Sequence, residues 1–75
     1  MKVYLIVLQD NKEQVFEASL DQFKAQKLCH ILAKATKKAM SVVTENYHDL
    51  SWTTRVQLRK TYPTFNKEVK NALNP

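Results

Sequence analysis

The chain contains no glycine, although average usage of about 7% would place roughly five glycines in a protein of this length. Phosphate-binding loops, dinucleotide fingerprints and nucleophile elbows all need a residue that tolerates positive φ or a close backbone approach. The absence of glycine therefore excludes these classes of site. It also leaves the turns to other residues, chiefly Asp10, Asn11 and Pro63. Of these, Asn11 is the one that most readily enters the left-handed region.

Cysteine is almost absent as well, because Cys29 is the only one. It cannot form an intramolecular disulfide, and a secreted domain this small usually needs several, so we expect a reducing, cytoplasmic location. Cys29 and His30 are adjacent on an expected helix and point about 100° apart, so they do not converge on one ion. His48 and Asp49 form the other candidate pair, but no recurring ligand spacing surrounds them. We expect neither a metal nor a cofactor.

Long hydrophobic runs are missing too. The apolar run Val3–Leu8 follows Lys2 as in a signal sequence, but it is short and Asp10 follows it without a cleavage site. No stretch approaches the roughly 20 apolar residues that span a bilayer. We therefore expect no leader and no membrane segment.

Catalytic patterns are equally scarce. No sequence feature places a histidine and an oxyanion donor beside Ser19, Ser41 or Ser51, and no pair of carboxylates forms a motif. A chain this short also rarely encloses a pocket of about 300 Å³ or more. We expect a protein that is not an enzyme.

What is present is typical of one small α+β domain covering residues 1–75, with 44% hydrophobic and 25% charged residues. The run 3–8 is apolar on both alternating faces, and 14–18 resembles a second strand after a turn, which predicts an antiparallel hairpin over 3–18. A strand that is apolar on both faces needs cover on both. If the chain does not cover it fully, a homodimer through this first strand follows.

A long amphipathic helix is expected over 20–39, capped by Ser19 or Asp21. Its apolar positions recur at helical spacing: Leu20, Leu28, Ile31, Leu32, Ala35 and Ala39. The opposite side carries a set that we call the lysine stripe, with Phe23 at its edge: Lys27, His30, Lys34, Lys37 and Lys38.

Residues 40–62 allow two interpretations. Met40–Tyr47 is rich in β-branched residues, and in 52–62 the residues alternate between two sides, with Trp52 on the more apolar one. This pattern favours a second hairpin whose second strand packs in the core. Alternatively, Val42, Val43 and Leu50 extend the first helix, and Ser51 caps another helix that ends before Pro63. The lack of glycine slightly favours the helical version, because a second tight turn would lack its preferred residue. A short terminal helix follows, capped by Thr64 and with Phe65, Val69, Ala72 and Leu73 on one face.

Charge is unevenly distributed along the chain. Residues 1–21 hold two lysines and four carboxylates, whereas residues 22–75 hold ten lysines or arginines and three carboxylates, for an overall net charge of +5. Such asymmetry attracts an acidic partner. The residues we expect to contact it are Phe23, Lys27, His30, Lys34, Lys37, Lys38, Arg55 and Arg59.

Two functions fit this pattern. The first is a non-enzymatic protein that binds and modulates or inhibits another protein with an acidic surface. A glycine-free chain rich in lysine and asparagine would suit an AT-rich genome, so a phage-type accessory protein that blocks a host defence or regulatory factor is one form of it. The second is a nucleic-acid-binding accessory protein, with the lysine stripe on phosphates and Trp52 or Phe65 stacking on bases. The competing interpretation of the stripe is a solvated helix face.

Overall fold

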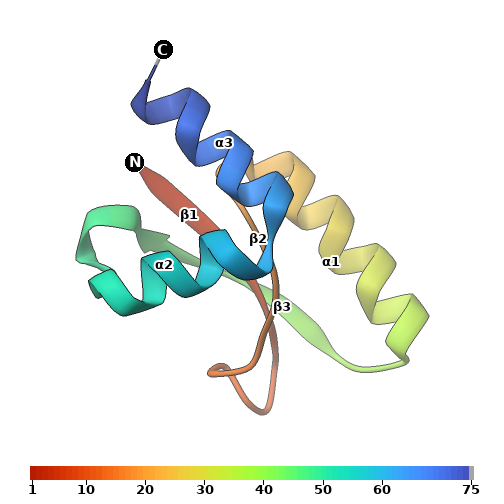
Figure 1. Cartoon of the computed structure of the whole chain (residues 1–75). Helices are drawn as coiled ribbons and strands as arrows, with labels where there is room; N and C mark the ends of the chain where they lie inside the picture. Colours follow the sequence, from red (N-terminus) through yellow and green to blue (C-terminus); the bar gives the residue numbers. More distant parts are fainter. Residues whose placement is uncertain (75) are drawn as a thin grey trace.

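The computed structural model describes residues 1–74 as a three-stranded antiparallel sheet with helices on both of its faces (Figure 1). The elements in chain order are β1 (Lys2–Leu8), β2 (Val15–Ser19), α1 (Gln22–Thr36), β3 (Met40–Asn46), the 3₁₀ turn η1 (Tyr47–Asp49), α2 (Trp52–Thr61) and α3 (Pro63–Leu73). The α+β class expected from the sequence is confirmed.

The predicted hairpin is formed by β1 and β2. In its turn, the Asn11 side chain accepts a hydrogen bond from the Glu13 backbone N–H at 3.3 Å, and the Asn11 carbonyl accepts one from the Gln14 N–H at 3.1 Å. Asn11 does not enter the left-handed region, contrary to the tendency of asparagine. Within residues 1–74 the only residue with positive φ is Lys37, at φ 57°.

The sheet order is β2-β1-β3, so β1 is the central strand. β3 pairs with β1 along its whole length, from Lys2 opposite Asn46 to Leu8 opposite Met40. Since β2 and β3 both run antiparallel to β1, they are parallel to each other, and α1 crosses over β1 to connect them. The second hairpin expected within 40–62 is therefore wrong. Its first strand exists as β3, but β3 pairs with β1.

Residues 52–61 form the helix α2, not a strand, and Tyr62 is its C-cap. Ser51 caps it as the helical interpretation predicts, with its Oγ accepting from the Thr54 N–H at 3.1 Å. Leu58 and Tyr62, four residues apart, turn toward the core. The competing expectation that Trp52 packs in a core strand is wrong, because 73% of the residue is exposed. The extension of α1 beyond residue 39 is wrong too, since α1 ends at Thr36 and β3 follows.

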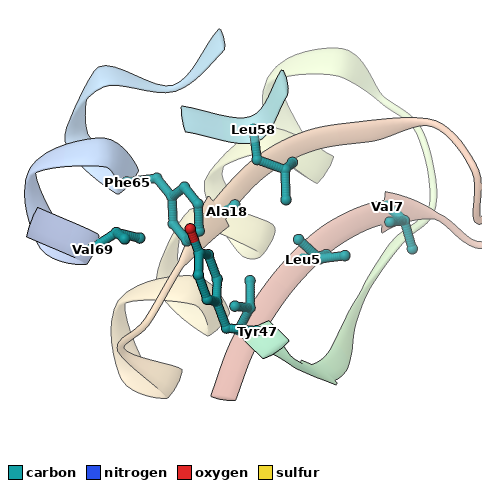
Figure 2. Packing of buried hydrophobic residues seen from close by; sticks show 8 residues of the cluster. Leu5, Val7, Ala18, Tyr47, Leu58, Phe65 and Val69 are labelled. Carbon is teal, nitrogen blue, oxygen red and sulfur yellow. The ribbon is translucent and has the colours of Figure 1, made fainter. Parts of the chain in front are cut away.

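One face of the sheet packs against α2 and α3. Figure 2 shows Phe65 and Tyr47 close together, with Leu5 of β1 next to them, Val7 farther along the strand and Leu58 above. The rings of Tyr47 and Phe65 have their centroids 6.5 Å apart. Phe65 and Val69 are fully buried, and burial of each such side chain contributes about 1.5–3 kcal/mol.

The other face packs against α1. α1 contacts all three strands but contributes no residue to the cluster around Phe65. Ile6 alternates with Leu5 and Val7 and is fully buried, as is Ala25 of α1. Both apolar faces of β1 are thus covered within the chain, as its pattern requires. The structure does not test the homodimer expected through this strand, but a second copy is not needed to cover Leu5, Ile6 and Val7.

α3 begins directly at Pro63, which occupies its first turn. Thr64 therefore lies inside the helix and is not its cap, contrary to the sequence expectation. Proline suits this position because the first-turn N–H groups have no partner within the helix. Phe65 and Val69 face inward as predicted, whereas Ala72 and Leu73 are exposed.

Candidate functional site

The helix α1 carries most of the predicted partner residues. Asp21 caps it, with Oδ1 accepting from the backbone N–H groups of Phe23 at 2.9 Å and Lys24 at 3.2 Å. The side toward the sheet presents Ala25, which is buried, together with the half-buried Leu28 and Leu32. The other side is open to solvent along the whole helix.

We call this open side the α1 outer face: Phe23, Lys27, His30, Ile31 and Lys34. All five are exposed, including Phe23 at 84% and Ile31 at 55%. The exposure of Ile31 corrects its predicted place in the core. Residues 23, 27 and 31 follow one another at intervals of four, so the two apolar side chains flank Lys27 on one surface. α1 contains no carboxylate, so the lysines give this face a positive charge without a negative one beside them on the helix.

The last two residues of the lysine stripe lie beyond the helix. Lys37 is the C-cap of α1, in the left-handed conformation, and Lys38 is in the following loop. Lys38 lines a hollow together with Asp10 from the β-hairpin. The stripe therefore continues past the helix, but it ends near a carboxylate.

Arg55 and Arg59 lie in α2, on the other face of the sheet, so the structure divides the predicted partner set between two surfaces. The guanidinium carbon of Arg55 lies 5.6 Å from the Tyr47 ring centroid, a cation–π contact. Its Nε is buried and has no hydrogen-bond partner within residues 1–74. Arg59 donates from Nε to the Asn66 Oδ1 at 2.7 Å.

The sequence left Trp52 either in a core strand or exposed to stack on bases, and the structure shows it exposed beside these arginines. Trp52, Arg55, Val56 and Arg59 line one hollow between α2 and the end of α3. Arg55, Val56 and Arg59 follow Trp52 by three, four and seven residues, the spacing of one helix face. The sequence predicts this face if Ser51 is the cap of a helix. Phe65 is fully buried and cannot stack on a base. The predicted combination of the lysine stripe with Trp52 is not assembled either, because the two are on opposite faces of the sheet.

The remaining reactive side chains stay apart. Cys29 is half-buried, and this burial raises the pKa of its thiol above the ordinary 9.0, while the adjacent His30 is exposed. His48 packs its ring edge-on against Tyr47 at 5.7 Å, and Asp49 accepts a hydrogen bond from Asn46 at 3.2 Å. In the part of the chain that the structure describes, no three His, Cys, Asp or Glu side chains are grouped so as to hold a metal ion. Nor is any helix among residues 1–74 long and apolar enough to cross a membrane.

The geometry therefore offers two candidate contact surfaces, the α1 outer face and the arginine-lined hollow of α2. Both consist of side chains on helices, as expected for a chain without glycine to line a site with backbone. Comparison of the chain with protein-family models, curated proteins and solved structures found no match.

Proposed function

We propose that this protein is a non-enzymatic binding protein that modulates or inhibits another protein through the α1 outer face. The observation that supports this most strongly is the pair of large apolar side chains, Phe23 and Ile31, exposed among cations. Interface energy is usually concentrated in a few apolar or aromatic anchors surrounded by polar residues. A surface that bound only phosphates would need the lysines and not the two apolar side chains.

The expected partner is a protein with an acidic surface and an apolar recess. Lys27, His30 and Lys34 surround the apolar residues, and α1 adds no negative charge. Charges of this kind raise the association rate and select against basic partners, whereas burial of Phe23 and Ile31 supplies affinity. The three-layer scaffold holds the helix from behind, so little ordering is needed on binding.

The biological setting belongs to the same proposal. A short chain with no glycine and abundant lysine and asparagine suits a phage-type accessory protein, acting in the cytoplasm on a host defence or regulatory factor. The single half-buried thiol fits a reducing compartment.

A charge-reversal variant with a matched control tests the proposal. The variant K27E/K34E/K37E changes the lysine stripe, and K12E/K67E/K70E makes the same change in net charge at exposed lysines elsewhere. The tagged proteins are used to capture partners from a nuclease-treated lysate of the cells in which the protein is naturally produced. We expect the wild type and the control to retain one protein in stoichiometric amount and the stripe variant to lose it.

A second variant separates apolar contact from charge. F23A removes the most exposed aromatic residue without touching the core, so folding should be unaffected. Loss of an anchor of this kind typically weakens binding by about 2 kcal/mol or more. The proposal fails if the wild type retains no stoichiometric protein, or if both the stripe variant and F23A bind as tightly as the wild type.

A further inference from the structure

The outer surface of α2 and α3 holds a second feature that the proposed function does not use. Trp52, Arg55, Val56, Arg59 and Leu73 line a hollow of about 210 Å³, and an adjoining hollow shares Val56 and Arg59 and adds Lys60 and Asn66. We call the two together the α2–α3 groove. No carboxylate lines either hollow, so the groove is cationic along its length.

Contacts within the protein hold the two arginine side chains of the groove in place before any ligand binds. Arg55 is held over the Tyr47 ring, and Arg59 is oriented by its hydrogen bond to Asn66. Neither arginine forms an ion pair within residues 1–74. They lie one helical turn apart on the same face of α2, and their terminal N–H groups suit anionic oxygens.

Trp52 lies on the same helix face, three residues before Arg55. With 73% of its surface exposed, its indole ring is free to stack on a planar group. An exposed tryptophan next to preset arginines matches a ligand that alternates flat rings with negative charges. An acidic peptide supplies the charges without the rings, and a nucleic-acid duplex hides the faces of its bases in its own stack.

We propose that the α2–α3 groove binds single-stranded nucleic acid, with successive phosphates on Arg55 and Arg59 and a base stacked on Trp52. This combination of a basic groove and an aromatic platform is the usual basis of sequence-tolerant single-strand binding. The groove and the α1 outer face lie on opposite faces of the sheet. Binding here therefore neither requires nor excludes the protein partner proposed above.

Fluorescence gives a direct test, because Trp52 is the only tryptophan in the chain. The full-length protein is titrated with a mixed-sequence single strand of about 12 nucleotides, within the usual site sizes for such grooves. The matching duplex and a poly-glutamate of equal charge are titrated in parallel. We expect saturable quenching of Trp52 by the single strand and weaker binding of the other two.

Variants assign the effect to the groove, with binding followed by the anisotropy of a labelled strand. W52A should weaken binding by between about fivefold and 150-fold, the usual effect of removing one stacked base contact. R59Q should reduce the slope of log K against log salt by about 0.7, the value for one phosphate of a single strand. The stripe variant K27E/K34E/K37E serves as the control and should keep the quenching of Trp52.

Three results would each overturn the inference. The first is an absence of quenching at about 50 mM salt, where phosphate contacts are strong. The second is binding of poly-glutamate or the duplex as tight as that of the single strand, which would indicate an acidic protein or a duplex as the ligand. The third is binding by W52A as tight as that of the wild type, because Trp52 would then not stack on a base. Since Trp52 is 73% exposed, we expect W52A to fold normally.

Discussion

Ser19, at the end of β2, donates its hydroxyl hydrogen to the Glu68 carboxylate of α3, with Oγ 3.0 Å from Oε2 and 3.1 Å from Oε1. The two residues are 49 positions apart in the sequence, and Ser19 is fully buried. Glu68 also accepts from the Leu20 backbone N–H at 2.9 Å and forms an ion pair with Lys24 at 3.3 Å. One carboxylate therefore joins the sheet, the start of α1 and the last helix.

The substitution E68A should be among the most destabilising changes at a polar residue. It leaves the buried Ser19 hydroxyl and the Leu20 N–H without their acceptor, at a cost of about 2–3 kcal/mol in the free energy of unfolding. Urea denaturation measures the loss. K24A is the control and should cost less than about 1 kcal/mol, because its ion pair is partly exposed. If the two variants are equally stable, the carboxylate does not have the joining role described above.

Tyr62 should make the protein sensitive to alkali. Its hydroxyl donates to the Val15 carbonyl at 2.7 Å, and burial, followed by the nearby Glu17, raises its pKa above the ordinary 10.0. Because the folded state holds this proton more tightly than the unfolded chain, the stabilisation is complete below about pH 10 and is lost as the pH rises through the folded pKa. Burial also raises the pKa of half-buried Cys29 above its ordinary 9.0, so its ionisation likewise lowers the free energy of unfolding at alkaline pH.

Y62F separates this effect from the titration of the lysines. Loss of the hydrogen bond should cost about 0.5–1.5 kcal/mol at neutral pH. Above pH 10 the free energy of unfolding should then fall less steeply in Y62F than in the wild type, as measured by denaturation at a series of pH values. Parallel pH curves for the two proteins would contradict the proposed contribution of Tyr62.

Lys37 occupies a conformation that glycine normally takes. It ends α1 at φ 57° and ψ 34°, where a side chain with a Cβ costs roughly 1 kcal/mol relative to glycine. K37G should therefore raise the free energy of unfolding by about 0.5–1 kcal/mol, detectable as a higher melting temperature. K38G, one residue later and without positive φ, should not stabilise. A stabilisation by K38G equal to that by K37G would remove the conformational explanation.

The protein should be monomeric. Leu5, Ile6 and Val7 of β1 are buried within the chain, so this strand leaves little apolar surface to favour a dimer. We expect sedimentation at about 100 µM to give the mass of one chain, since a stable dimer usually buries about 800 Å² per partner. A dimer at that concentration would direct attention to the exposed apolar residues of α1 and α2.

The local elements were largely predictable because their signals are local. The alternation of 3–8, the turn at Asn11 and the caps Asp21 and Ser51 are all read within a few residues of the structure they determine. Where a strand pattern and a helix pattern fitted the same residues, the sequence alone did not decide between them. Residues 52–62 alternate like a strand, yet the same positions place Leu58 and Tyr62 on one helix face, and contact with the core decided for the helix.

The candidate sites were predictable only in part. The spacing of lysines on α1 identified a cationic face, but not that Ile31 would be exposed beside them. Arg55 and Arg59 were grouped with the lysines because charge along a sequence does not show which face of a sheet each helix covers. The exposure of Trp52 depended on the same missing information.

By itself, the sequence determined an α+β domain without glycine-dependent sites, a hairpin, a capped amphipathic helix and a first strand that needs cover on both faces. Only the tertiary structure decided that β3 would pair with β1, that α1 and the α2–α3 pair would lie on opposite faces, and that Ser19 would meet Glu68. The physical reason is the distance along the chain over which the interactions act. Turns, caps and periodicity act between near neighbours, whereas strand pairing and burial depend on which distant segments together exclude the most water.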